Sequence, residues 1–327
     1  MSVLPEEGRL PALIERNYDE QITGRRWQEL FFFPADRFIH HQFAELARVA
    51  DYLNHYRIIP CCRVLPRRDG TYLLEVDGTA SVLLQQPSSV PADQANLRIG
   101  AMLAAFHRAT RGADPRRFRE TPFYERIDRL ITRKETLDRR YRALLAKGDP
   151  DRFERHFLNS YLYFSGCAEN AIQYFVDIGI DFPVPEPLVL THDRFSGPAS
   201  LIPENPARWV ADARGRDLAE WLRWIAWNET GEEAIRSASL FLDDYESVFP
   251  LSDQAAAYLF GRLLFPFPYV DCCEQYFAAD RLSPGEREEL SQLLLLHEGR
   301  IRRQERMLAY LGRRRKRLPL PEWLVNR

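Results

Sequence analysis

Lysine, the side chain that could supply an amine to catalysis or a compact charge to a phosphate, is scarce in this 327-residue chain. Lys134, Lys147 and Lys316 are the only lysines among 45 basic residues, and the others are arginines. A lysine amine can form a Schiff base or act as a point charge on a phosphate, whereas a guanidinium is broad, planar and always protonated. We therefore exclude mechanisms that need an amine from the part of the chain before Lys134.

Cysteine and histidine spacing does not predict a metal site or a disulfide framework. Cys61-Cys62 and Cys272-Cys273 are adjacent pairs, and Cys167 makes the total odd, so C-x-x-C metal spacing is missing. We expect a reducing compartment and buried pairs, with cross-linking through an exposed pair as the alternative. His40-His41 cannot share one helix face because the two residues are adjacent. The sequence contains no G-x-S-x-G or H-E-x-x-H motif, so no motif in it indicates a hydrolase.

Composition describes an ordinary globular protein. Hydrophobic residues make up 45 % of the chain, charged residues 28 %, and the formal net charge is −2, which favours neither disorder nor nucleic-acid binding. The N-terminus lacks a basic flank and an apolar core, and no stretch approaches about 18 uncharged apolar residues. We expect synthesis in the cytoplasm without a signal peptide and no membrane span. The basic run 313–317 could dock on an acidic partner or on nucleic acid; a solvated helix end is the alternative.

Strands are expected in the first ninety residues. The aromatic run 25–33 predicts a strand that Pro34 ends, and apolar spacing predicts a helix over 36–55. Segments 57–66, 71–78 and 81–86 predict a three-strand meander. Its first turn, Asp69-Gly70, has the composition of a type I′ hairpin turn, in which both central residues need positive φ.

Helical patterns dominate after a polar, proline-containing stretch over 85–94, which we interpret as a hinge. Helices are expected over 97–111, 121–146, 152–177, 218–228, 232–248, 253–260 and 284–311, with strands within 180–202 and 207–217. The predicted architecture is α+β with two lobes: a β-rich lobe over 1–86, a hinge over 87–94 and a helical lobe over 95–327. We expect a ligand site in the cleft between these lobes.

Three segments occur in the order and spacing of a known superfamily: IGAMLAAFHRATRG (99–112), LVLTHDRFSGPASLI (188–202) and WVADARGRDLAEWLR (209–223). They resemble the leucine-alanine-x-x-histidine helix, the catalytic loop and the metal-binding strand of the aminoglycoside phosphotransferase and choline kinase superfamily. The resemblance implies a protein-kinase-like fold. Further segments resemble the kinase-like proteins of bacterial spore coats: ENAIQYF (169–175), RDLAEWLRW (216–224), FLDDYESVFPLS (241–252), RLLFPFPYV (262–270) and LPEWL (320–324).

The catalytic loop departs from the pattern that the resemblance implies. That pattern is H-G-D-x-x-x-x-N, in which the aspartate is the base and the asparagine holds a metal. Aligned without gaps, His192 keeps its place and Asp193 takes the glycine position, but Arg194 replaces the aspartate and Ala199 the asparagine. A guanidinium cannot accept a proton near neutral pH, and a methyl group cannot ligate a hard cation. A one-residue slip would make Asp193 the base, but it would remove the glycine of the turn and still supply no asparagine.

Neighbouring residues have expected roles under the same resemblance. Asp212 stands at the metal-binding aspartate and is a poor magnesium site without partners. We expect Arg194 to form an ion pair with Asp212 in the space a metal would need. His192 is expected to be a buried histidine that holds the loop by hydrogen bonds, and Asp217 to cap the following helix.

The small lobe lacks the parts that would hold nucleotide phosphates. It contains no lysine, and before Gly70 the only glycines are Gly8 and Gly24, too few for a glycine-rich cover loop. Arg25 or Arg26 could substitute in principle, without reproducing the reach of a lysine. Glu45 is either the helix carboxylate that once paired with the lysine or a solvated surface glutamate.

Loss of the cover loop, lysine, base and second metal ligand predicts a noncatalytic protein, because removal of one base or phosphate clamp costs about 100- to 10,000-fold in rate. The resemblance implies a pseudokinase-like component of the bacterial spore coat that contacts other coat proteins and needs no cofactor. The alternative is an active ATP-dependent small-molecule phosphotransferase. It would use Asp193 or a remote carboxylate as base, and Asp212 to hold Mg²⁺.

Overall fold

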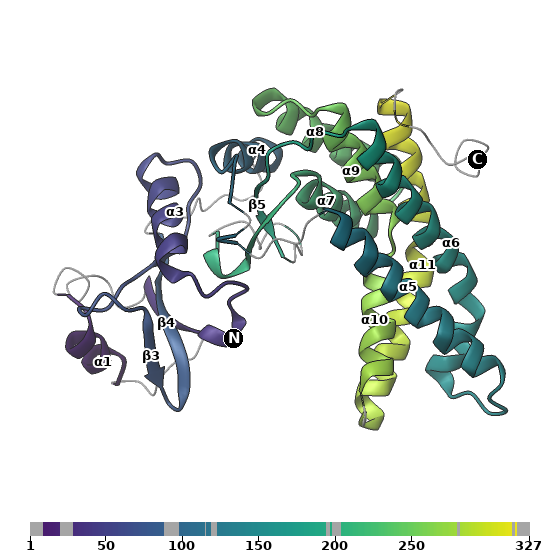
Figure 1. Ribbon diagram of the computed structural model, residues 1–327, viewed down its shortest axis with the longest axis horizontal. Helices are drawn as coiled ribbons and strands as arrows, with labels where there is room; N and C mark the ends of the chain where they lie inside the picture. Colours follow the sequence, from purple (N-terminus) through teal and green to yellow (C-terminus); the bar gives the residue numbers. More distant parts are fainter. Residues whose placement is uncertain are drawn as a thin grey trace. The chain divides into compact units, whose positions relative to one another are not determined.

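The structure is a computed structural model that describes residues 9–19, 29–87, 98–114, 116–118, 123–193, 197, 204–279, 282–315 and 318 (Figure 1). Its contacts divide the chain into two compact units. The first comprises Met1–Glu120, Pro187–Asp217 and Leu240–Pro250, and the second comprises Thr121–Glu186, Leu218–Ser239 and Leu251–Arg327. The predicted division at 87–94 stays a prediction, and residues 88–97 lie outside the described part.

The predicted α+β class is confirmed by the elements of the chain. The first unit contains α1 (Arg9–Asn17), β1 (Leu30–Pro34), the 3₁₀ turn η2 (Ala35–Arg37), α3 (Phe43–His55), β2 (Arg63–Val64), β3 (Leu73–Val76), β4 (Thr79–Gln85), α4 (Ile99–Ala109), β5 (Val189–His192), the 3₁₀ turn η4 (Pro206–Arg208) and β6 (Trp209–Asp212). Two helices, α7 (Gly215–Asn228) and α8 (Gly231–Val248), contribute residues to both units. The second unit adds α5 (Phe123–Leu145), α6 (Arg152–Asp181), α9 (Asp253–Leu264), α10 (Phe267–Ala278) and α11 (Pro284–Arg314).

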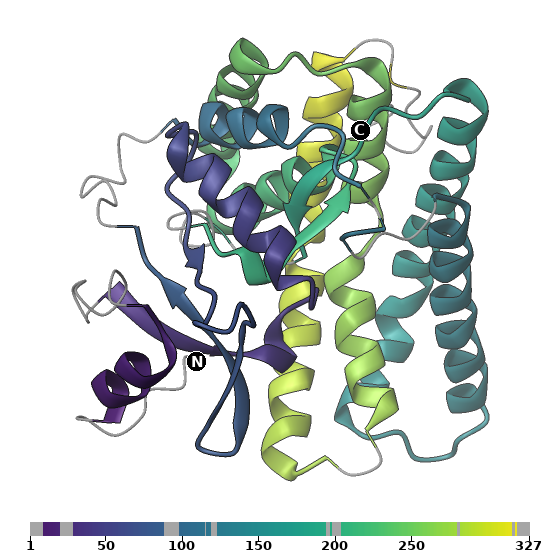
Figure 2. The ribbon, with the colours of Figure 1, turned by 60° about the vertical axis from the view of Figure 1, so that its left-hand side comes forward.

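Strand β4 is the centre of the first sheet, because every other strand of that sheet pairs with it (Figure 2). β1 runs antiparallel along one edge, from Leu30↔Gln85 to Pro34↔Ser81. β3 and then β2 share the other edge, through Leu73↔Val82 and Val64↔Leu84. The predicted meander is therefore wrong in its pairing: β2 and β3 both pair with β4.

The type I′ turn lies one turn later than predicted. Asp77 and Gly78, which join β3 to β4, have φ angles of 49° and 77°, as that turn requires at both central residues. At the predicted position, Gly70 has φ 79° but Asp69 is not in the left-handed region, and a Gly70 N–H to Arg67 carbonyl bond of 2.9 Å closes an ordinary turn. The composition of both turns was suitable; strand pairing decides which one becomes a hairpin.

Helix α3 starts at Phe43 instead of the predicted residue 36. The chain first makes η2, and Phe38 is extended and buried, with its ring edge-on to Phe33 and Phe43 at 5.4 and 5.2 Å. Aromatic packing thus interrupts the helical spacing of the segment. Helix α1, which sequence reasoning did not predict, buries Ile14 beside Leu30 and Leu83 of the sheet.

A second pair of strands, β5 and β6, forms an antiparallel ladder from Val189↔Asp212 to His192↔Trp209. Helix α4 packs on β5, and its Gly100 allows a close approach to the last turns of α8. A Cβ at Gly100 would lie 2.1 Å from the Phe241 carbonyl oxygen, so no larger residue fits this crossing.

The second unit is helical, with α6 packed against α5, α9 and α11. Capping boxes begin α6 at Asp151 and Glu154 and α11 at Ser283 and Glu286. Helix α10 was missed because PFP at 266–268 reads as a break; Pro268 instead lies in its first turn, where a missing N–H costs little. Among the described residues, none of the helices combines the length and apolarity needed to cross a bilayer.

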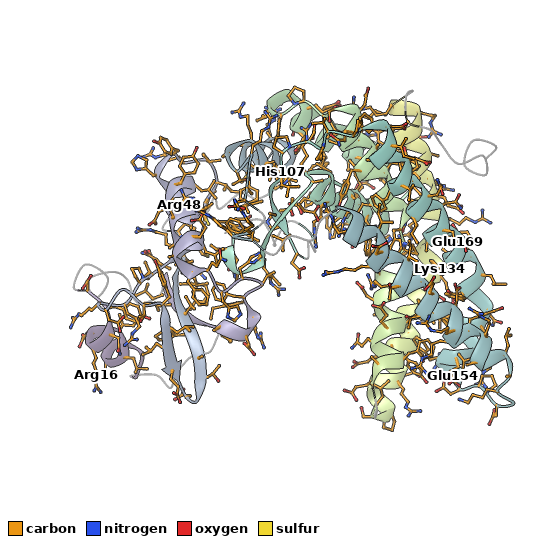
Figure 3. All side chains as sticks on the ribbon, in the orientation of Figure 1. Arg16, Arg48, His107, Lys134, Glu154 and Glu169 are labelled. Atoms are coloured by element: carbon orange, nitrogen blue, oxygen red, sulfur yellow. The ribbon has the colours of Figure 1, made fainter. Side chains whose placement is uncertain are left out.

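The described lysines are both engaged on the surface of this unit (Figure 3). Lys134 pairs with Glu169 and, at 2.9 Å, with Asp138; Lys147 lies 2.6 Å from Glu154. The two adjacent cysteine pairs are buried, as predicted, and Cys167 is partly exposed. Arg313 and Arg314 form the last turn of α11, which agrees with a helix end for the start of the basic run; residues 316 and 317 lie outside the described part.

Candidate functional site

The site predicted from sequence lies in the first unit, where β5 and β6 place His192 and Asp212 at opposite ends of the ladder. All eight residues of the two strands are buried. Glu204 is brought to the same place by a parallel bridge to Cys61, with bonds from Cys62 N–H to the Glu204 carbonyl (2.8 Å) and from Glu204 N–H to the Pro60 carbonyl (2.9 Å). Backbone pairing therefore fixes a carboxylate beside His192.

His192 is held between two carboxylates. Its Nδ1 lies 2.7 Å from Asp217 Oδ2, its Nε2 bonds to Glu204 Oε1, and its backbone N–H donates to Asp217 Oδ1 at 3.0 Å. The three side chains are essentially inaccessible to solvent. The structure thus places His192 as expected, buried and hydrogen-bonded through both ring nitrogens.

Three more side chains extend this network, which we call the His192 network: Tyr245, His107, Asp217, His192, Glu204 and Trp209. His107 Nε2 lies 3.2 Å from Asp217 Oδ2, and His107 Nδ1 lies 2.9 Å from the Tyr245 hydroxyl. Trp209 Nε1 donates to Glu204 Oε1 at 2.8 Å. Buried hydrogen bonds of the network join α4, β5, β6, α7 and α8. A buried hydrogen bond stabilises a fold most where its donor and its acceptor are both paired.

The charges of the network follow from its contacts. Burial alone would lower the pKa of His192, but the Glu204 and Asp217 carboxylates raise it to about 10. Burial would raise the pKa of Asp217, yet the His192 imidazolium holds that pKa well below its ordinary value. Burial lowers the pKa of His107. His192 is therefore an imidazolium between two carboxylates, and it has no free nitrogen to act as a general base.

The raised pKa of His192 gives a prediction with a definite sign. An unperturbed histidine titrates near pH 6.5, so between about pH 6.5 and 10 the folded chain keeps a proton that the unfolded chain has released. This group's contribution to stability is complete below about pH 6.5 and is lost as pH rises toward 10, by about 1.4 kcal/mol per pH unit. In NMR spectra of histidine-labelled protein, we expect the His192 ring to keep imidazolium shifts up to pH 8. A titration midpoint below pH 7 would show that the two carboxylates do not hold the charge.

Asp212 is neutralised by an arginine, but the described partner is Arg216. Arg216 donates to Asp212 Oδ2 at 2.9 Å and to the His192 and Asp193 carbonyls, each at 2.9 Å. Asp212 Oδ1 accepts from the Ala213 N–H at 2.6 Å. One guanidinium therefore fastens the backbone of His192 and Asp193 to Asp212, the residue that the resemblance predicts at the metal position.

The other residues predicted for the site are Asp193, Arg194, Ala199 and Asp217, and the structure treats each prediction differently. The side chain of Asp193 is 33 % exposed, and its Oδ1 lies 3.5 Å from Arg216, so Asp193 and Asp212 converge on the same guanidinium. Arg194 and Ala199 lie outside the described residues, and the pair of Arg194 with Asp212 stays a prediction. The predicted helix cap at Asp217 is wrong: this residue is inside α7, which begins at Gly215, and its carboxylate is bonded to His192 and His107.

Among the described residues, those around Asp212 do not fit a magnesium ion. Magnesium needs several oxygen ligands in octahedral geometry, and both oxygens of Asp212 already have donors. Within the described residues, no group of three or more histidine, cysteine, aspartate or glutamate side chains could hold a metal. The first unit also has no lysine, because Lys134, Lys147 and Lys316 all belong to the second.

Glu45, the predicted lysine partner or surface glutamate, is paired with arginines. Its side chain is 15 % exposed and bonds to Arg48 and to Arg117 at 3.1 Å, so a solvated surface glutamate is wrong. The Arg48 hydrogen bond lowers the pKa of Glu45. This pair lines a hollow of about 400 Å³ between α3 and residues 109–118, segments of the two predicted lobes.

Sequence reasoning missed three residues that hold the site together: Glu204, His107 and Arg216. His107 was visible only as part of the leucine-alanine-x-x-histidine pattern, and Arg216 as one of many arginines. Glu204 had no signal, because its place beside His192 depends on a bridge to Cys61.

With this geometry in place, residues 15–311 match the family described as spore coat putative kinase YutH. The chain belongs to this family. The endospore coat-associated protein YutH of Bacillus subtilis (strain 168) is 29 % identical over 273 residues, which cover 82 % of this chain and 79 % of that protein. The predicted resemblance to spore-coat kinase-like proteins is thereby confirmed.

Solved structures confirm the protein-kinase-like fold of this YutH-family chain. An aminoglycoside phosphotransferase from Alicyclobacillus acidocaldarius matches with a TM-score of 0.62 and 12 % identity, covering 88 % of this chain and 87 % of that one. A spectinomycin phosphotransferase, solved with ADP and spectinomycin, matches with a TM-score of 0.50 and 9 % identity over 84 % and 85 % of the two chains. Both likenesses concern the fold alone.

Proposed function

We propose that this YutH-family chain is a noncatalytic kinase-fold protein that acts as a structural or assembly component of the bacterial spore coat. The observation that carries the first part is the engagement of Asp212 by Arg216 at 2.9 Å. Phosphoryl transfer requires a metal-holding carboxylate, a cation on the nucleotide and a base. The aspartate at the metal position is instead part of a buried ion pair.

Two further observations support the loss of catalysis. The only positive side chains of the first unit are arginines and histidines, and among the latter His192 is enclosed between Glu204 and Asp217. Asp193, the one aspartate that a shifted alignment would make the base, lies 3.5 Å from Arg216. We propose that the chain uses neither ATP nor Mg²⁺ as a cofactor.

The coat role is supported by the family and by the name of the B. subtilis relative, an endospore coat-associated protein. We propose the same location for this chain, with other coat proteins as its partners. A chain without turnover can contribute to a coat only through the surfaces it presents, so a fixed internal network such as that of His192 suits this role.

Phosphate release from ATP tests the loss of catalysis. We expect the purified full chain with Mg²⁺ and ATP to release phosphate no faster than buffer, alone or with aminoglycoside or choline as acceptor. Asp193→Ala and Asp212→Asn should leave that background unchanged. Release that disappears in Asp193→Ala while the fold is intact would establish the phosphotransferase instead.

Fractionation of mature spores tests the coat role separately. In a spore former that carries this chain, a tagged full-length protein should be recovered with the extracted coat layers, and the Asp193→Ala variant should be recovered equally. Recovery only from the spore core would contradict a coat component, whatever the activity measurements show.

A further inference from the structure

Helix α11 of the second unit presents one exposed face in its middle turns. It packs beside α6, α9 and α10 (Figure 2), and Leu290, Leu294 and Leu308 are buried there. On the opposite side, exposed residues follow one another at spacings of three and four, which places them on a single face of the helix. These residues, which we call the α11 face, are Glu289, Gln292, Leu296, Gly299, Arg303 and Arg306.

Opposite charges divide α11 near its middle. Residues 284–298 contain four glutamates and one arginine, whereas residues 299–314 contain six arginines and one glutamate. The helix dipole favours acids in the first turn and cations in the last turn, but its effect falls off within those turns. Glu289, Arg303 and Arg306 lie further inside the helix, so the dipole does not account for their placement.

The charges at the two ends of the α11 face have no ionic partner in the described part of the chain. Neither Glu289 nor Arg306 forms a hydrogen bond or an ion pair through its side chain with a described residue. Arg303 donates to the Trp227 carbonyl at 3.0 Å and meets no described carboxylate. The face therefore offers acid at one end and cations at the other.

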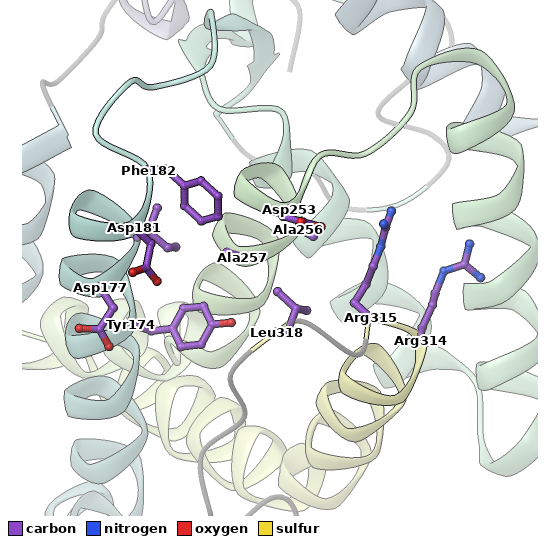
Figure 4. Close-up of a pocket in the computed structure, with 11 residues that line it drawn as sticks. Tyr174, Asp177, Asp181, Phe182, Asp253, Ala256, Ala257, Arg314, Arg315 and Leu318 are labelled. Carbon is purple, nitrogen blue, oxygen red and sulfur yellow. The ribbon is translucent and has the colours of Figure 1, made fainter.

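The arginines at the end of α11 are engaged by the chain itself and do not belong to the face. Arg314 and Arg315 line a pocket of about 390 Å³ (Figure 4). Arg314 donates to the Ser239 hydroxyl at 3.4 Å, and Arg315 donates to the Leu251 carbonyl at 3.2 Å. The basic run at the helix end is thus distinct from the free charge of the α11 face.

Gly299 lies at the centre of the α11 face, between its acidic and basic ends. A Cβ at this position would meet nothing within 4 Å, so packing within the chain gives no reason for a glycine there. Glycine destabilises a helix interior relative to alanine, and its use is to let another chain approach closely. Leu296 and Leu293 beside it are 47 % and 37 % exposed. The centre of the face is therefore apolar and open to close approach.

We propose that the α11 face binds the same face of a second copy of this chain, with the two helices antiparallel. A two-fold axis between Leu296 and Gly299 places Leu296 of one copy over Gly299 of the other. The same register sets Glu289 of each copy opposite Arg306 of the other. Such self-complementarity is what a two-fold interface requires. This dimer goes beyond the proposed coat role and does not depend on it.

A second copy fits the α11 face better than an acidic partner does. An acidic segment laid along the whole face would meet Arg303 and Arg306 favourably, but it would meet Glu289 as a like charge. It would also leave the exposed Leu296 without an apolar contact. The second copy supplies a cation for Glu289 and a glycine for Leu296 at the same time.

Analytical ultracentrifugation of the full chain tests the proposal. We expect a monomer–dimer equilibrium with a micromolar Kd, and association about tenfold weaker in about 0.5 M NaCl, because salt screens accessible charge pairs. Gly299→Leu should weaken association by about tenfold or more, since it fills the point of closest approach. The same variant should melt at the same or a higher temperature, because leucine is the better helix former and the space around Gly299 is open.

Charge reversal identifies the opposed residues. Glu289→Arg and Arg306→Glu should each weaken association by about tenfold, and the double variant should restore it to within about threefold of the original. Within one chain the two positions lie about 26 Å apart along the helix, so only contact between copies can produce this rescue. Glu135→Arg, the same change at an exposed position of α5, is the control and should leave association unchanged.

Three results would overturn the proposal. The first is a chain that stays monomeric at high micromolar concentration. The second is a dimer that Gly299→Leu and both charge reversals leave unchanged, because its contacts would then lie elsewhere. The third is a monomer that binds polyglutamate through Arg306, because the basic end of the face would then serve an acidic partner.

Discussion

Replacement of Asp217 by alanine is expected to lower the free energy of unfolding by about 3–5 kcal/mol at pH 7. The Asp217 carboxylate accepts the His192 backbone N–H, His192 Nδ1 and His107 Nε2, all without access to solvent. Its removal would leave three buried donors without an acceptor and would leave the His192 imidazolium with Glu204 alone. Removing one partner of a buried charge pair is costly because the other charge stays buried.

Urea unfolding followed by tryptophan fluorescence measures this effect, since Trp209 lies in the same network. Asp217→Asn keeps an oxygen acceptor but loses the charge, so it should cost less than alanine. Asp193→Ala, at the partly exposed neighbour of His192, is the matched control and should cost about 1 kcal/mol or less. An Asp217→Ala variant as stable as this control would mean that the network does not hold the fold.

Replacement of Arg216 by alanine is expected to cost about 2–4 kcal/mol. Asp212, which is 2 % exposed, would lose its cation, and the His192 and Asp193 carbonyls would lose a donor. Arg216→Lys keeps the charge but not the planar fork that reaches three acceptors, so we expect an intermediate loss. The loss in the free energy of unfolding is measured for both variants from the shift of the denaturant midpoint, with the m-value unchanged.

Arg48→Ala provides the comparison for Arg216→Ala. Arg48 is also bonded to a carboxylate, Glu45, but its side chain is 67 % exposed, so its loss should cost about 1 kcal/mol or less. If Arg216→Ala cost no more than Arg48→Ala, the ion pair at the metal position would be as weak as a surface pair. The conclusion that Arg216 fastens the His192 and Asp193 backbone to Asp212 would then fail.

Much of the fold could be predicted where one local signal was strong. Helices α6 and α11 begin at the predicted residues because capping boxes and apolar spacing agree there. Helix α10 was missed because two prolines hid it, and α3 was predicted seven residues too early because the ring of Phe38 packs in an extended segment. The sheet order depends on long-range pairing with β4, which no local pattern contains.

The contacts of the candidate site were harder to predict from the sequence than the fold was. The strand positions of His192 and Asp212, and the absence of lysine before Lys134, could be read from the residues themselves. Their partners could not, since His107 and Asp217 meet across 110 residues and His192 and Asp217 across 25. An arginine was predicted on Asp212, but the described one is Arg216, which lies four residues further along the chain, at the start of α7.

The physical result is a protein-kinase-like fold in which several carboxylates of the first unit pair with cations of the same chain. Asp212 is held by Arg216, Asp217 and Glu204 by His192, and Glu45 by Arg48 and Arg117. In a phosphotransferase such carboxylates would face metal, nucleotide or lysine. Internal pairing of this kind can preserve the architecture without a ligand, which suits the coat role that we propose.

The most direct test of the proposed loss of nucleotide chemistry is a melting curve of the full chain with ATP, with and without Mg²⁺. A ligand that binds the native state at 100 times its Kd adds about 2.7 kcal/mol of stability, which a melting curve detects readily. We predict that ATP with Mg²⁺ at millimolar concentration leaves the melting temperature where Mg²⁺ alone leaves it. A magnesium-dependent rise that Asp212→Asn abolishes would contradict a noncatalytic scaffold and restore the phosphotransferase.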